Sequence, residues 1–381
     1  MSSKSLATPF IRHVTSRGYA QTAPVAKKEA RLQTSVLPNK TFVAALDNGS
    51  PVTRLTIAFK AGSRYEPQTE LGLAHVLRSA AGLSTKNSSA YMIRRQLTQI
   101  GASFTASGDR EFVYYTVEAT QDNLKTALEY LNKIVSNQEF RPWELTDNLP
   151  RLRYDIAALP PQDTACLLAD SLQLSSLVQE SKSDTTTYYG GELRKEMGGD
   201  LAHVALALQG APASIPQSLA LAVAARALGC GPVTKWGANN SPVAKAIGNI
   251  GPFAAAGFNV SYSDSGLFGV VLSVPKDEAN AAVKAVANLL KQPLSADAIK
   301  AGKNQLKLQV LAEAEDGTSL AESLAAQGLF TGSAKSPLDI AREIDQLSTN
   351  DVSQAMSNAS RSKLSMGSAG NLAFVPFVDE L

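Results

Sequence analysis

The sequence predicts an α+β protein built from two tandem copies of one domain, with the first copy shortened at its C-terminal end. The main observation is a repeated order of elements: strand, helix, hairpin, helix and helix occur twice, about 150 residues apart. Length and composition agree with this prediction. A chain of 381 residues is long for a single hydrophobic core, and 44% apolar with 18% charged residues is typical of globular proteins.

Each copy opens with a strand whose apolar side chains alternate with small or polar ones. In the first copy these are Leu55, Ile57 and Phe59, and in the second they fall within residues 204–208. A period of two places them on one face, which indicates a half-buried strand. Just before the first of these strands, Asn48-Gly49 predicts the tight turn of a β-hairpin.

A helix and then a hairpin follow each opening strand. The helical stretches are apolar and cover residues 73–81 in the first copy and 219–228 in the second. Turn-forming residues then separate two strands in each copy, at 108–109 and at 264–266. The predicted hairpin strands are 104–107 with 112–117 in the first copy, and 258–262 with 267–274 in the second.

Two further helices follow each hairpin. Apolar residues at helical spacing predict them over 124–135 and 145–156 in the first copy, and over 283–290 and 299–310 in the second. Up to this point the two copies match element by element, which favours a duplicated fold over two unrelated domains.

The second copy then continues for about 60 residues, to Gly370. This extension predicts a helix over 340–347, a helix that Ser348 opens with Asp351 in a capping box, and a strand over 363–368. A complete copy of the domain therefore ends with two helices and a closing strand.

The first copy lacks room for these last elements. Only about 35 residues separate Ile156 from the glycine pair at 190–191, and most of them are polar. A missing strand leaves unpaired backbone and bare apolar surface, so either a partner covers the gap or the chain is a shortened version of a longer one. The predicted divisions are a first domain at 40–174, a linker or junction at 175–190, and a second domain at 191–381.

The N-terminal segment is typical of a mitochondrial transit peptide. It is rich in Ser and Thr and has no acidic residue before Glu29. The arginine of Arg17-Gly18-Tyr19 has the spacing of a matrix cleavage site, so residues 1–19 are predicted to be removed. Without Lys4, Arg12 and Arg17 the formal net charge falls from +2 to −1. The alternative is a basic tail with no targeting role.

Two motif groups carry a resemblance to a known family. Residues 62–66 (GSRYE) and 72–77 (GLAHVL) resemble the signature strand and helix of the pitrilysin/insulinase-type zinc peptidases. Within that family, residues 258–269 and 370–381 closely resemble the core proteins of the mitochondrial bc1 complex, and so does 140–144 (FRPWE). The resemblance implies two tandem α+β domains of the insulinase and mitochondrial-processing-peptidase type.

The zinc site of the active relatives is degenerate in this chain. Those enzymes use His-x-x-Glu-His on a helix, with two zinc ligands and a general base. The matching positions are His75, Arg78 and Ser79, and the best match for the third ligand is Asp155. One histidine and one aspartate do not make a catalytic zinc site, and Arg78 would repel the metal ion. The resemblance therefore implies a chain that is not an enzyme and holds neither metal nor cofactor.

No other chemistry is indicated by the sequence. Cys166 and Cys230 have no His or Cys beside them, which favours small buried side chains over nucleophiles. His203 is predicted to be structural, on a strand. The glycines around 229–237 follow a helix and lack the spacing of a dinucleotide-binding loop. The sequence has no long apolar stretch for a membrane span and no basic stripe for nucleic acid.

The resemblance implies a scaffold role in mitochondrial ubiquinol–cytochrome c reductase, on the matrix side of the inner membrane. The implied partners are the other core protein, cytochrome b, cytochrome c1, the Rieske iron–sulfur subunit and the small subunits. Two alternatives remain. One is an α-type subunit of the mitochondrial processing peptidase, which binds presequences without cleaving them; the other is a free matrix protein outside any complex.

Overall fold

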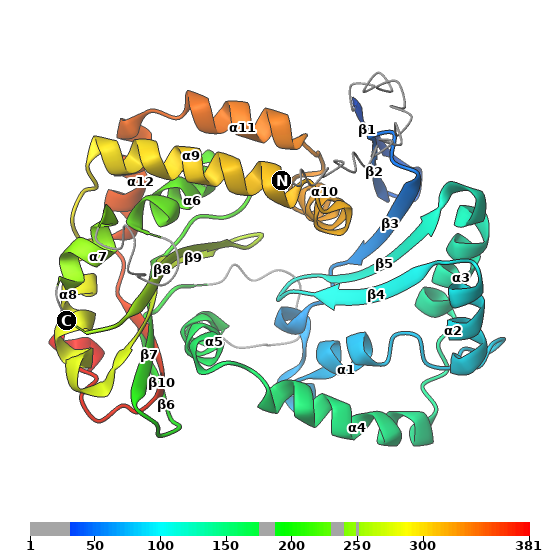
Figure 1. Cartoon of the computed structure of the whole chain (residues 1–381), viewed down its shortest axis with the longest axis horizontal. Coiled ribbons are helices and arrows are strands. Elements are labelled where there is room, and N and C mark those ends of the chain that lie inside the picture. Colours follow the sequence, from blue (N-terminus) through cyan, green and yellow to red (C-terminus); the bar gives the residue numbers. More distant parts are fainter. Residues whose placement is uncertain (1–30, 175–186, 230–239, 249–250) are drawn as a thin grey trace, which may run out of the picture.

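The computed structural model describes residues 31–174, 187–229, 240–248 and 251–381. The predicted transit peptide, Cys230 and most of the predicted linker lie outside these residues. Within them, helices and sheets occur in two halves (Figure 1) that share the order strand, two helices, hairpin and three helices, and the α+β prediction is confirmed. None of the helices in these ranges has the length and apolarity to cross a bilayer.

The first half contains a two-stranded and a three-stranded sheet. Its strands are β1 (Arg31–Val36), β2 (Phe42–Asp47), β3 (Val52–Phe59), β4 (Ser103–Gly108) and β5 (Val113–Thr120). The larger sheet has the order β3-β5-β4, all antiparallel, and β1 pairs only with β2. The predicted hairpin around Gly108 is therefore confirmed as β4–β5, with Gly108 opposite Val113.

One prediction for this half was wrong. Asn48 and Gly49 lie in the connection between β2 and β3, and Gly49 has a φ of +69°. The strands on either side, β2 and β3, do not pair with each other, however, because β2 pairs with β1 and β3 with β5. The positive φ of Gly49 agrees with the local signal, but the partner of each strand is decided by tertiary contacts that the dipeptide does not report.

Five helices belong to the first half. They are α1 (Leu73–Ser79), α2 (Ala90–Gln99), α3 (Leu124–Ser136), α4 (Pro142–Ala157) and α5 (Pro161–Leu174). Helices α2 and α3 bury Ile93, Leu131 and Ile134 against the apolar side chains of β5, such as Val117. The amphipathic stripe predicted after the hairpin is thus the main core contact of this half.

The second half has one mixed sheet of five strands. They are β6 (Gly191–Glu196), β7 (Leu201–Gln209), β8 (Ala254–Ser261), β9 (Gly266–Pro275) and β10 (Ser365–Gly370), in the order β6-β10-β7-β9-β8. The last strand of the chain is inserted between the first two, parallel to β6 and antiparallel to β7.

Among the described residues, the second half of the chain contains seven α-helices. They are α6 (Pro216–Leu228), α7 (Pro242–Ile247), α8 (Ala279–Leu290), α9 (Ala296–Glu313), α10 (Gly317–Thr331), α11 (Pro337–Gln346) and α12 (Thr349–Ala359). The predicted capping box at the start of α12 is confirmed, with Ser348 and Asp351 each accepting a backbone N–H of the other.

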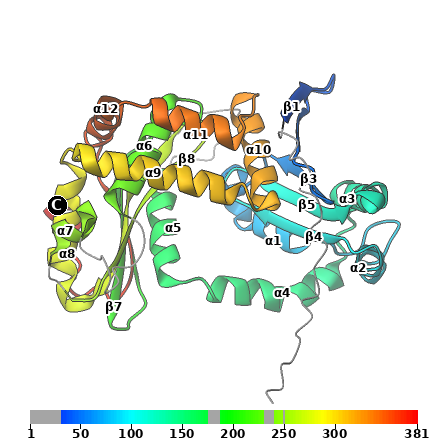
Figure 2. The ribbon, with the colours of Figure 1, turned by 45° about the horizontal axis from the view of Figure 1, so that its top comes forward.

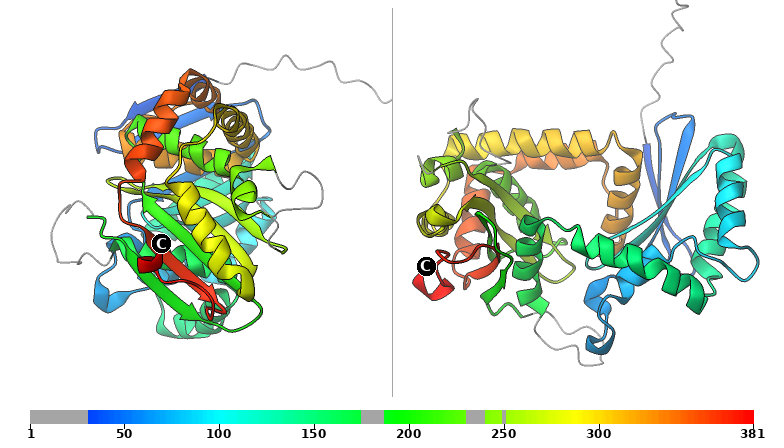
Figure 3. Two further views of the ribbon diagram at one scale, coloured as in Figure 1. Left: turned by 90° about the vertical axis from the view of Figure 1, so that its left-hand side faces the viewer. Right: turned by 60° about the horizontal axis from the view of Figure 1, so that its bottom comes forward.

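The two halves exchange one helix each. Helix α5 is the last helix of the first half in sequence, but it packs on β10 and β7 of the second sheet. Its counterpart α10 follows α9 and packs on β3 and β2 of the first half. Figures 1 and 2 show the two connections, α4–α5 along one side of the molecule and α9–α10 along the other, and Figure 3 shows them from two further directions. This exchange makes each half depend on the other for part of its cover.

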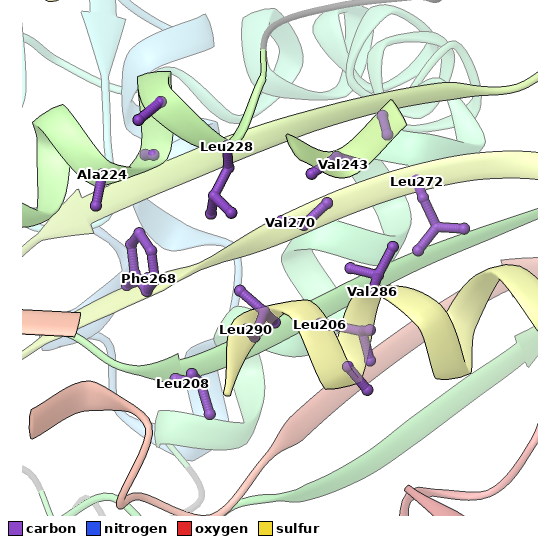
Figure 4. Close-up of a cluster of buried hydrophobic side chains, with 14 of the residues drawn as sticks. Leu206, Leu208, Ala224, Leu228, Val243, Phe268, Val270, Leu272, Val286 and Leu290 are labelled. Atoms are coloured by element: carbon purple, nitrogen blue, oxygen red, sulfur yellow. The ribbon is translucent and has the colours of Figure 1, made fainter. Parts of the chain in front are cut away.

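The larger core lies in the second half. Helices α6, α7 and α8 cover one face of the sheet, and fully buried residues such as Phe268, Leu272 and Leu290 meet there (Figure 4). The apolar alternation along β7 and β9 supplies one side of this core, because residues at every second position point to the same face.

Candidate functional site

Helix α1 carries the degenerate zinc-site positions, and Glu66 fixes its start. The helix begins after Gly72, which has a φ of +96° that favours glycine. The buried Glu66 carboxylate accepts hydrogen bonds from the backbone N–H groups of Gly72 (2.8 Å) and Ala74 (2.5 Å). These would otherwise be free N–H groups at a helix start, where negative charge is favourable. In this chain, then, the glutamate of GSRYE has a structural role.

The imidazole of His75 is bound by its neighbour on the helix. The Nη2 of Arg78 lies 2.8 Å from His75 Nδ1. A guanidinium only donates hydrogen bonds, so Nδ1 accepts and the ring proton is on Nε2. Burial and the charge of Arg78 lower the pKa of His75, and this effect outweighs the opposing carboxylates of Asp155 and Glu66. The lone pair of Nδ1 on the neutral His75 ring is therefore already taken up by the hydrogen bond from Arg78.

The other two positions do not complete a metal site. Ser79 ends α1, and its backbone carbonyl accepts a hydrogen bond from Asn148 of α4 (3.2 Å). Asp155, also on α4, is close enough to His75 to act on its charge. The structure thus places Asp155 near His75 and Arg78. The donor set does not fit zinc, because a cation stands in the position of the general base and no second imidazole is present.

Within the described ranges, no group of three or more His, Cys, Asp or Glu side chains has an arrangement that could hold a metal ion. His203 lies on β7, where its Nδ1 is 2.7 Å from Ser273 Oγ. Burial lowers the pKa of His203 and raises that of the Cys166 thiol to about 11. A raised thiol pKa opposes nucleophilic chemistry, because the thiolate is the reactive form.

Several charged residues to which the sequence analysis gave no role of their own form a junction between the halves. Arg64, in the 3₁₀ turn Ser63–Tyr65, pairs with Glu111 of the first half and with Asp264 of the second, both at 2.6 Å. Glu111 is 1% exposed and also accepts from the N–H and hydroxyl of Ser263 (3.0 and 2.7 Å). Burial lowers the pKa of Arg64, but the two carboxylates more than compensate, so its pKa is raised.

A second ion pair lies beside the first. Arg110 pairs with Asp170 of α5, whose carboxylate also accepts the hydroxyl proton of Tyr262 at 2.6 Å. Burial lowers the pKa of Arg110 to about 10 and raises that of Tyr262 to about 12. Both groups nevertheless keep their usual charge at neutral pH. The junction is therefore a set of partly desolvated ion pairs, and each of its charged side chains named here has a partner of opposite charge.

Sequence reasoning missed this junction because its members are far apart in the chain. Glu111 and Ser263 are 152 residues apart, and Arg64 and Asp264 are 200 residues apart. The available signal was the pair Arg110-Glu111 directly before an apolar strand, since such a strand rarely begins with two buried charges. This signal indicated that the two charges have partners of opposite charge, but it did not identify those partners.

Family models match both halves of the chain. The model described as "Insulinase (Peptidase family M16)" matches residues 42–180, and "Peptidase M16 inactive domain" matches residues 171–306. The chain is 31% identical to cytochrome b-c1 complex subunit 2 of Homo sapiens and 30% identical to that of Rattus norvegicus, in each case over 92% of both chains. It is 23% identical to a probable mitochondrial-processing peptidase subunit alpha-1 of Arabidopsis thaliana, over 96% of this chain and 87% of that one.

Proposed function

Since the chain belongs to the insulinase (M16) peptidase family, we propose that it is a non-catalytic structural core subunit of mitochondrial ubiquinol–cytochrome c reductase, complex III. The observation that carries this proposal is the likeness to subunit 2 of the cytochrome b-c1 complex, which extends over nearly the whole chain. Associated with the mitochondrial inner membrane, the subunit contributes to electron transfer by supporting the redox subunits, and not by chemistry of its own.

Finer features belong to the same proposal. The subunit faces the matrix and contacts the other core protein, cytochrome b, cytochrome c1, the Rieske subunit and the small subunits. Residues 1–19 are the transit peptide, and the two domains are residues 40–174 and 191–381, joined by residues 175–190. The positions His75, Arg78, Ser79 and Asp155 are the remains of a zinc site and have no catalytic role.

Blue-native electrophoresis of mitochondria that carry a tagged copy of this chain tests the role. We expect the tag to migrate with cytochrome b in one large complex, because a structural subunit stays bound to its complex during native electrophoresis. Migration with presequence-cleaving activity would instead support an α-type processing-peptidase subunit. A small free species would support a matrix protein outside any complex, and either result would contradict the proposal.

Metal content tests the loss of the zinc site. We expect the purified chain to contain far less than one zinc per molecule, because Arg78 places a positive charge beside the one remaining imidazole. The double variant Arg78→Glu/Ser79→His restores the family pattern with His75, and we expect its zinc content to rise. Elemental analysis measures both proteins after the same dialysis. Stoichiometric zinc in the unaltered chain, or chelator-sensitive peptide cleavage by it, would show that the site still functions.

A further inference from the structure

The two halves differ at one place in their sheets. In the second half, β6 ends at Glu196, β7 begins at Leu201, and β10 lies between these two strands. In the first half, β2 ends at Asp47 and β3 begins at Val52, so the connection has the same length. No strand in the described part of the chain lies between β2 and β3, and β3 is the outer strand of its sheet.

Helix α10 contacts both strands beside this place. Gly328 of α10 lies against the ring of Phe42 in β2, and Gly317 at its start lies against the Arg54 side chain of β3. Helix α5 contacts β6 and β7 in the same way, with β10 held between them under the helix. The first half therefore has both neighbours of a central strand and the helix that covers it, but not the strand itself.

We propose that this position, the β2–β3 opening, binds an extended segment of a partner polypeptide as an added strand. By analogy with β10, the segment would run parallel to β2 and antiparallel to β3. Its backbone would pair with the strand edges, which is the usual source of affinity when a strand is added to a sheet. This inference does not rest on the proposed role in complex III, because it concerns the fold of the first half alone.

Strand β10, used as the template, also indicates which side chains the partner segment can carry. A Cβ atom on Gly367 of β10 would lie 2.2 Å from the backbone oxygen of Ala165 in α5, and Ala369 is fully buried against the same helix. Only small side chains fit where a helix crosses a central strand this closely. The partner segment is therefore expected to carry Gly, Ala or Ser at alternate positions, on the side that faces α10.

Two of the chain's own segments outside the described residues fit this template poorly. Residues 175–186 (SSLVQESKSDTT) have Ser at 181 and 183, which the template allows, but they contain neither Gly nor Ala and carry three charged side chains. They connect α5 to β6, which both lie on the second sheet, and twelve residues span at most about 40 Å. A six-residue strand in the first half would use half of that length. Residues 20–30 contain Pro24, which cannot donate a hydrogen bond inside a sheet. A segment supplied by another polypeptide is the better occupant.

A peptide with the sequence of residues 363–371 (KLSMGSAGN) is a direct probe, because this sequence fills the equivalent position in the second half. The purified full chain is mixed with the peptide, and amide hydrogen exchange is followed by mass spectrometry. We expect exchange in both β2 and β3 to slow by about tenfold or more at saturation, since local opening must then break new hydrogen bonds. The control peptide carries Gly367→Pro and should protect neither strand.

The two-sided pattern distinguishes this position from an ordinary sheet edge. Binding at the outer strands β4 or β8 would protect one strand only, and that result would contradict the proposal. No protection at saturating peptide would also overturn it. If the amides of β2 and β3 that do not bond to β1 or β5 are already protected before peptide is added, the chain fills its own opening and the partner assignment is wrong. A peptide with a photoreactive group at the position of Met366 should cross-link to residues of both β2 and β3.

Discussion

Replacing Phe268 by alanine is expected to lower the free energy of unfolding by about 4 kcal/mol, the largest effect of any single change proposed for this chain. Phe268 lies on β9 in the main core, with no exposed surface, between the sheet and the helices that cover it (Figure 4). Removing the ring loses its transfer free energy and leaves a cavity that the surrounding strands and helices close only in part.

Urea denaturation followed by far-UV circular dichroism measures this change, and Phe374→Ala is the matched control. Phe374 is 53% exposed, so the same chemical substitution should cost less than 1 kcal/mol there. Equal losses for the two variants would mean that Phe268 is not at the centre of a packed core.

Removing the carboxylate of Glu111 is expected to cost about 3 kcal/mol, because it breaks a buried ion pair from one side. In Glu111→Ala the guanidinium of Arg64 keeps Asp264 but loses its buried partner, while the N–H and hydroxyl of Ser263 lose their acceptor. The groups left behind remain desolvated, so the cost exceeds the value of the pair itself.

The control for this variant is Glu139→Ala. Glu139 pairs with Arg141 at 2.8 Å, but both side chains are substantially exposed, and such pairs contribute about 1 kcal/mol or less. Chemical denaturation compares the two variants with the parent chain. A loss at Glu111 no greater than at Glu139 would show that the junction does not hold the halves together.

Assembly gives the Glu111 result a second readout. If the junction fixes the relative position of the halves, Glu111→Ala should reduce the amount of tagged chain in the large complex more than Glu139→Ala does. The physical reason is that a partner that contacts both halves recognises their arrangement, and a looser junction lowers the population of that arrangement.

Much of the fold could be predicted because it depends on local patterns. Alternation predicted β3 and β7, turn residues predicted both hairpins, and Ser348 with Asp351 predicted the start of α12. Each of these follows from the period of the side chains or from a short-range hydrogen bond. The hairpin predicted at Asn48-Gly49 shows the limit of this approach, since the two strands that these residues connect pair elsewhere.

The candidate site divides in the same way. The degenerate zinc positions were predicted from the resemblance to the zinc peptidases, and the structure adds that Arg78 binds His75 directly. The junction of Arg64, Glu111 and Asp264 could not be predicted, because ion pairs between distant segments leave no periodic signal in a single chain.

The sequence by itself determined the duplicated α+β design, because this design depends on residue types and their order. It also predicted a shortened first copy and a degenerate zinc site. Only the tertiary structure decided that α5 and α10 are exchanged between the halves, that buried charges join them, and that β2 and β3 belong to different sheets. These features depend on which segments meet in space, and packing of the whole chain determines that, not the pattern within any one element.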